Sequence, residues 1–247
     1  MLPFSARTRT ANLTRMAEDR FDVLVGLRSA ADARAAGAAP RGDQRRGRLR
    51  RSAAALWANH RASDAHDHVL QDLGARFDAV LEAVEATHGW VTNRVTPGKI
   101  ILGELGDIES GVRQLIRNRP LEVTEVTLPS GQILQVPTLD ETLRIKGYLI
   151  VRRNQVRDYL DVAALSDRYG ISHSADVLGR IDAYYSDQRG PDPEGVATQL
   201  ARQLADPRPA DTRTIQQLGQ YKDLDARWTD WKNVTKVCRS VALEMVQ

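Results

Sequence analysis

The sequence has almost no cysteine and no long hydrophobic run. Cys238 is the only cysteine in 247 residues, so no disulfide can form within the chain and no paired-cysteine zinc motif exists. This usage is typical of a reducing compartment. The opening "MLPFSARTRTANLTRM" lacks the apolar run of a signal peptide, and no segment of about 18 apolar residues is present to span a membrane. We therefore expect a cytoplasmic protein with no membrane partner.

Large apolar side chains are scarce in residues 1–51, which are rich in alanine and arginine. Residues 41–51, "RGDQRRGRLRR", hold six arginines against one aspartate, although the net charge of the whole chain is only +3. Such a block is usually solvated, and less often a nucleic-acid contact. We expect a basic, poorly ordered N-terminal segment, because so few apolar groups bury little surface.

The rest of the chain predicts strands followed by helices. Apolar residues at helical spacing predict a helix over 73–87, namely Phe77, Val80, Leu81 and Val84. Runs rich in β-branched residues predict strands over 89–95 and 98–105. Residues 121–137, "LEVTEVTLPSGQILQVP", read as a β-hairpin turning at Ser130-Gly131. Thr138 and Glu141 form a capping-box pattern, and nearly everything after them reads as helix. The fold class is therefore α+β, with domains at 1–51, 52–137 and 138–247.

A charged stretch lies within the helical part, "RIKGYLIVRRNQVRDYLDVAALSDRYG", residues 144–170. On one continuous helix, Lys146, Arg153, Arg157 and Asp161 would fall within roughly 80° of arc. If Asn154 instead breaks the run and caps a second helix, Arg157 and Asp161 still share a face. A surface ion pair between Arg157 and Asp161 would explain two of these residues. It would not require Lys146, Arg153 and Asp158 to lie nearby, which slightly favours a functional site.

This stretch resembles the C-terminal motif of nucleotidyltransferase toxins of the AbiEii (MenT) type, found in toxin–antitoxin and abortive-infection systems. The family keeps a lysine, an arginine and an Arg-Asp-x-x-Asp run, which here are Lys146, Arg153, Arg157, Asp158 and Asp161. A looser likeness extends from about His60 to the C-terminus.

The resemblance implies a nucleotidyltransferase-like small mixed β-sheet with helices, followed by a helical C-terminal region. It implies transfer of a nucleoside monophosphate from an NTP to an RNA, with the tRNA 3′ end as acceptor and an antitoxin as partner. Mg²⁺ would be held by Asp64 and Asp67. Asp67, Lys146 and Asp161 would be catalytic, with Lys146 on the triphosphate. Arg153, Arg157 and Asp158 would bind substrate.

The segment that would hold the metal departs from the family pattern, which is Gly-Ser followed by Asp-x-Asp. The corresponding "HRASDAHDHVL" places Ala65 two residues before Asp67, while Asp64 is one position out of place. Asp64 and Asp67 would point to opposite sides of a strand. No Gly-Ser turn precedes them to approach a triphosphate. An alternative is therefore a catalytically degraded relative that binds a protein or an RNA.

Histidines around the same segment suggest a second, weaker alternative. His60, His66 and His68 with Asp64 and Asp67 are the residue types of a metal-hydrolase site, but histidine-rich loops seldom bind metal. Farther along, Trp228 and Trp231 are three residues apart and are expected to pack in the core. Tyr184-Tyr185 could stack on a base, although such a pair more often packs a helix end.

Overall fold

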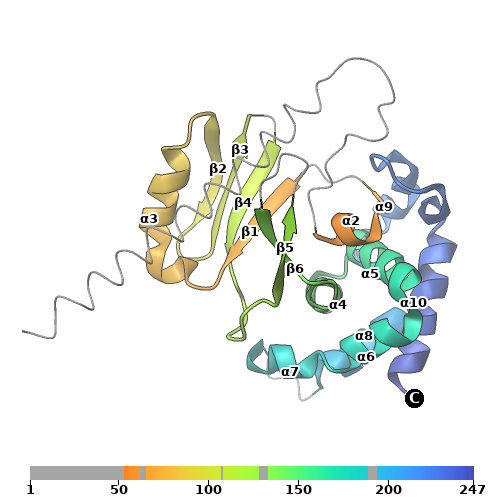
Figure 1. The fold of residues 1–247 in the computed structure, drawn as a ribbon. Helices are drawn as coiled ribbons and strands as arrows, with labels where there is room; N and C mark the ends of the chain where they lie inside the picture. The colour runs from red at the N-terminus through yellow and green to blue at the C-terminus, as the bar shows by residue number, and fades with distance from the viewer. Residues whose placement is uncertain (1–52, 62–64, 107, 128–132, 189–193) are drawn as a thin grey trace, which may run out of the picture. The chain divides into compact units, whose positions relative to one another are not determined.

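The computed structural model describes residues 53–61, 65–106, 108–127, 133–188 and 194–247, without the side chains of residues 65 and 66. These residues divide into two units (Figure 1). The sheet unit runs from residue 65 to 115, and the helical unit holds the described residues before 65 and after 115. The predicted disorder of residues 1–51 falls outside the described residues. The predicted domain limits stay a prediction.

The sheet unit contains a four-stranded sheet in the order β1-β4-β3-β2. Strand β1 is parallel to β4, whereas β4 with β3 and β3 with β2 are antiparallel, so the sheet is mixed. The α+β class with a small mixed sheet is thus confirmed. The elements are β1 (Ala65–Leu70), α3 (Leu73–Glu85), β2 (Trp90–Thr96), β3 (Ile100–Leu105) and β4 (Ile108–Gln114).

Helix α3 covers one face of this sheet. Phe77, Val80 and Val84, which the helical spacing singled out, are buried in one cluster with Ile101 and Val112 of the strands. The helix ends at Glu85, two residues earlier than predicted. Amphipathic spacing located the helix because burying one apolar stripe is what fixes it on the sheet.

The predicted hairpin is present and belongs to the helical unit. Strands β5 (Val123–Thr127) and β6 (Ile133–Pro137) pair antiparallel, with Thr127 opposite Ile133. The predicted turn at Ser130-Gly131 lies outside the described residues. Thr138 then caps the next helix, since its hydroxyl accepts a hydrogen bond from the Glu141 amide at 3.2 Å.

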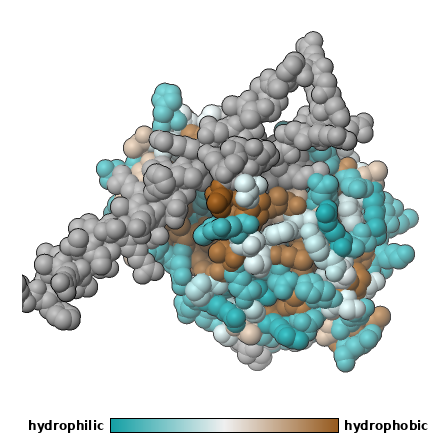
Figure 2. Space-filling view, in the orientation of Figure 1, coloured by the Kyte–Doolittle hydropathy of each residue, from teal (hydrophilic) through white to brown (hydrophobic). Residues whose placement is uncertain are grey.

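Helices make up most of the helical unit, and the long C-terminal helix α10 packs against α5, α6 and α8. Trp228 is buried and Trp231 is half-buried against the core, as predicted. On the face that Figure 2 shows, apolar residues lie among hydrophilic ones. The α-helices of this unit are α2 (Ala53–Ala58), α4 (Leu139–Arg153), α5 (Val156–Tyr169), α6 (Ile171–Gly179), α7 (Asp182–Tyr185), α8 (Val196–Ala205), α9 (Arg213–Gln216) and α10 (Trp231–Met245).

Candidate functional site

A sharp corner between α4 and α5 positions the charged stretch. Asn154 adopts a left-handed conformation, with φ of +50°, and ends α4. Its side-chain oxygen accepts a hydrogen bond from the Tyr159 hydroxyl at 2.6 Å, and its carbonyl accepts one from the Ala210 amide at 2.7 Å. The chain therefore forms two helices packed on each other, not one continuous helix.

This corner brings Lys146 of α4 against Asp161 of α5. Lys146 Nζ lies 2.6 Å from Asp161 Oδ2. Two residues that precede the sheet unit complete the group: Arg61 Nε and His60 Nε2 lie 3.0 Å and 2.7 Å from Asp161 Oδ1. Asp161 is fully buried. Its carboxylate is therefore paired on both oxygens.

The electrostatics of Asp161 follow from these contacts. Burial alone would raise the pKa of Asp161, but the charges of Lys146 and Arg61 and the hydrogen bond with His60 outweigh burial and hold this pKa well below its ordinary value. In return, Asp161 outweighs the effect of burial on Arg61 and raises the pKa of that guanidinium. A carboxylate held ionised in this way is a weak proton acceptor.

Asp158 is the second fully buried carboxylate of the group. Arg153 binds it with both Nε and Nη2, at 2.6 Å and 2.8 Å, while Lys146 Nζ lies 3.6 Å from Asp158 Oδ1. Lys146 thus joins two buried carboxylates, an arrangement that fixes α4 against α5. Arg157 is exposed and forms no ion pair with any described residue, Asp161 included.

The sequence-predicted site residues therefore fall into two sets. The helical unit brings Lys146, Arg153, Asp158 and Asp161 together, and Arg157 lies apart from them. Asp67 lies in the sheet unit, on β1. Their assignment as catalytic and substrate-binding residues stays a prediction. Sequence reasoning missed His60 as a partner of Asp161 and missed Arg61 altogether, because about 100 residues separate them from that aspartate.

Asp67 is half-exposed and pairs with Arg113 of β4 at 3.1 Å. It lies over Gly111, where a Cβ atom would come within 2.6 Å of Asp67 Oδ1, so the absence of a side chain at Gly111 makes room for the carboxylate. Asp64 lies outside the described residues. Among those that are described, no three His, Cys, Asp or Glu side chains form a group suited to a metal ion. Magnesium binding by Asp64 and Asp67 stays a prediction.

A second charged cluster joins the segment after β4 to helix α4. Arg117 Nη2 lies 2.5 Å from Glu141 Oε1, and both side chains are fully buried. Glu141 also binds Arg144 at 3.2 Å, so it serves this ion network and not the return half of a capping box. Tyr185 is buried under the Arg117 guanidinium and stacks on Tyr148, which confirms that it packs a helix end. The cluster holds the fold together.

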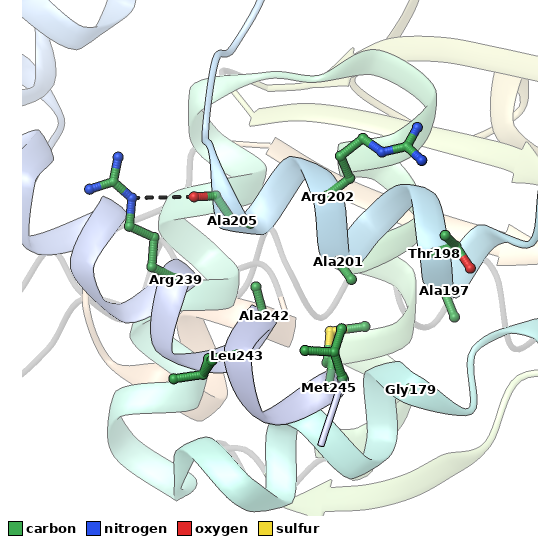
Figure 3. Close-up of a pocket in the computed structure, with 11 residues that line it drawn as sticks. Gly179, Ala197, Thr198, Ala201, Arg202, Ala205, Arg239, Ala242, Leu243 and Met245 are labelled. Atoms are coloured by element: carbon green, nitrogen blue, oxygen red, sulfur yellow. Dashed lines mark hydrogen bonds between the residues drawn. The ribbon is translucent and has the colours of Figure 1, made fainter.

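A groove in the helical unit was not foreseen from the sequence (Figure 3). It lies along α8 and the end of α10 and encloses about 670 Å³. Its floor is apolar, while two arginines and one threonine are its polar lining residues. The sequence feature that could have predicted the groove is a row of alanines four residues apart on α8. Their small side chains leave space along that face of the helix. The apolar lining includes Ala197, Ala201, Ala205, Ala242, Leu243 and Met245.

The groove exposes apolar side chains at its α10 end. Leu243 is 61% exposed and Val246 is 73% exposed, whereas core residues nearby are buried. Arg239 Nε donates a hydrogen bond to the Ala205 carbonyl at 3.3 Å, across the groove. Arg202 instead binds Glu194, with Nη1 at 3.0 Å and Nη2 at 2.5 Å. An apolar floor with one incompletely paired cation is suited to an amphipathic ligand.

Comparison with known proteins gives matches to one kind of protein. The chain is 44% identical over 131 residues to the mycolic acid-containing lipids exporter MmpL11 of Mycolicibacterium smegmatis. It is 46% identical over 132 residues to the heme uptake protein MmpL11 of Mycobacterium tuberculosis. Each match covers 53% of this chain but only 13% of the relative. The chain matches no family profile and no solved structure.

These relatives overturn the resemblance to nucleotidyltransferase toxins. They are named as an exporter, an uptake protein and transport proteins, so the predicted nucleotide transfer and the NTP, tRNA and antitoxin partners are wrong. The alternative of a degraded relative that binds protein or RNA is supported no better. The motif misled because its lysine, arginine and aspartates also satisfy one another: Arg153 and Lys146 pair with Asp158 and Asp161 in a buried network.

The prediction of a cytoplasmic protein without a membrane partner is wrong on the same finding, because the relatives are named for transport. Within the described part of the chain, no helix combines the length and the apolar character needed to cross a bilayer.

Proposed function

We propose that this chain works in lipid transport, as a part that binds the transported lipid. The observation that carries the proposal is the 44–46% identity, over about half of the chain, to MmpL11 proteins of mycobacteria. At that identity the matched residues share a fold with the corresponding part of those proteins. One of them is named for exporting mycolic acid-containing lipids.

The groove along α8 and α10 supports a lipid as the ligand. Its volume of about 670 Å³ lies inside the usual range for small-molecule sites, roughly 300–1,000 Å³. Its alanine side chains offer no hydrogen-bonding group, and Thr198 is the one lining residue with a hydroxyl, which suits an acyl chain. Contact with such a chain would cover the exposed side chains of Leu243 and Val246.

Heme is the other transported molecule in the relatives' names, and the groove favours it less. The iron of heme is usually held by His, Cys or Tyr, or by Met together with His. Met245 is the only one of these types in the lining, so a heme there would have a single weak axial ligand. The predicted nucleotidyltransferase-like form of the sheet concerns the fold alone and adds no activity to this proposal.

Lipid retention tests the proposal directly. The purified chain would be incubated with an extract rich in mycolic acid-containing lipids, separated by gel filtration, and examined for co-eluting lipid by mass spectrometry. We expect the wild-type chain to retain lipid and Ala201→Trp, which fills the groove, to lose at least nine-tenths of it. Ala75→Trp, on the exposed side of α3, is the matched control and retains it.

Two outcomes contradict the proposal. If the wild-type chain elutes without lipid, the chain does not bind lipid and the proposal is wrong. If the wild type and Ala201→Trp retain equal amounts of lipid, the lipid is bound outside the groove.

A further inference from the structure

We infer that the groove selects a carboxylic acid with an acyl chain, and that Arg239 binds the carboxylate while the acyl chain lies along the alanines of α8. The inference rests on the proposed function, since it names the chemical class of the lipid. It goes beyond that function by assigning the headgroup and the residue that recognises it.

The charge of the lining sets the sign of the headgroup. Arg202 and Arg239 are the charged residues that line the groove, and no aspartate or glutamate lines it. An apolar floor with positive charge at its edge complements a ligand that is apolar along its length and negative at one end. A cationic lipid would be repelled by these two side chains, and a neutral lipid would gain less from them than an anion does.

The two arginines differ in what remains available to a ligand. Glu194 occupies both terminal nitrogens of Arg202, so the charge of that guanidinium is already neutralised. Figure 3 shows Arg202 extending away from the alanines of its own helix. Arg202 is therefore the weaker candidate, although it lines the same groove.

Arg239 has its terminal nitrogens free of described partners. Only its Nε is engaged, by the carbonyl of Ala205, and this bond holds the side chain beside the C-terminal end of α8, with its terminal nitrogens directed outward from Ala201 and Ala242 (Figure 3). The remaining edge, Nη1 with Nη2, presents two parallel N–H donors. That geometry matches the two oxygens of one carboxylate. The Ala205 carbonyl positions the guanidinium, and the guanidinium would then bind the acid.

The test compares an acid with its own ester on matched variants. Dansyl-labelled undecanoic acid and its methyl ester would be titrated into the wild-type chain, Arg239→Gln and Arg202→Gln, with dansyl fluorescence as the readout. We expect the wild type to bind the acid at least tenfold more tightly than the ester. Arg239→Gln should bring that ratio below threefold, chiefly by weakening acid binding, and Arg202→Gln should keep the wild-type ratio.

The possible outcomes separate this inference from the proposed function. An acid-to-ester ratio near one in the wild type, or a ratio that Arg239→Gln does not change, overturns the inference while lipid binding in the groove stands. A ratio lost equally in Arg202→Gln assigns selectivity to overall charge and also overturns the role of Arg239. Failure of both ligands to bind any of the three proteins overturns the proposed function as well.

Discussion

Lys146 Nζ lies 2.6 Å from Asp161 Oδ2, and the Asp161 side chain is fully buried. Lys146 itself is 14% exposed, so its charge also is largely removed from water. Such a pair is coupled to folding, because loss of either partner leaves less of the other's buried charge compensated.

Removal of the lysine charge is the first test of that coupling. Lys146→Met keeps the length of the side chain and leaves Asp161 with Arg61 and His60, and Asp158 with Arg153. We expect the free energy of unfolding to fall by about 1–3 kcal/mol, the range for a lost hydrogen bond to a charged group, because both carboxylates keep other cationic partners. Urea denaturation followed by circular dichroism at 222 nm measures it. Lys236→Met, at an exposed position of α10, is the control and should change stability by less than about 0.5 kcal/mol.

Asp161 predicts a definite dependence of stability on acid. Its pKa is lowered in the folded chain, whereas an unfolded aspartate titrates at about 3.9. The stabilisation is therefore complete above pH of about 4 and is lost as the pH falls from there towards the lower folded pKa. Urea midpoints measured between pH 6 and pH 3 should fall in the acid range. Asp161→Asn should flatten that decline, and exposed Asp176→Asn should not; an equal decline in all three proteins would contradict the assignment.

A close contact between helices predicts a different kind of loss. A Cβ atom on Gly147 of α4 would come within 2.8 Å of both Leu178 Cδ2 of α6 and Leu200 Cδ2 of α8. Gly147→Ala should therefore destabilise the chain by about 1–3 kcal/mol, the range for overpacking a core. Gly179→Ala meets no atom within 4 Å and should be neutral or slightly stabilising. Thermal unfolding of the two variants compares them, and equal melting temperatures would show that the helices separate without cost.

Chain length provides a test of the groove that is independent of the headgroup. A fully buried methylene contributes about 0.8 kcal/mol, roughly a fourfold change in Kd. Because the groove is open along one side, we expect about two- to fourfold tighter binding per added methylene, until the groove is filled. Competition against the dansyl-labelled acid by unlabelled fatty acids of increasing length measures this. Affinity independent of chain length would place the ligand outside the groove.

Local pattern was enough to predict much of the fold. The apolar spacing of Phe77, Val80 and Val84 located α3 because burial of one helix face needs no information from elsewhere in the chain. The hairpin strands β5 and β6 also followed from alternation and turn residues. Helix ends were less accurate, since the last turn of α3 depends on the chain that follows it.

The candidate site could be predicted only in part. Spacing placed Arg157 and Asp161 on one helix face and suggested that they pair, yet Arg157 is exposed and Asp161 pairs with Lys146 across the corner. The turn at Asn154 rotates α5 in a way that spacing along one helix cannot anticipate. The contacts from His60 and Arg61 depend on tertiary packing over about 100 residues.

The two-residue corner at Asn154 and Gln155 also limits how this chain can change in length. Each residue added to or removed from a helix turns everything beyond it by about 100°. One residue inserted at the start of α5, before Asp158, would turn Asp158 and Asp161 by that angle about the helix axis, away from the ammonium that both of them contact. The segment therefore tolerates exchange of side chains more readily than any gain or loss of a residue, and related chains should keep its length constant even where their sequences have diverged.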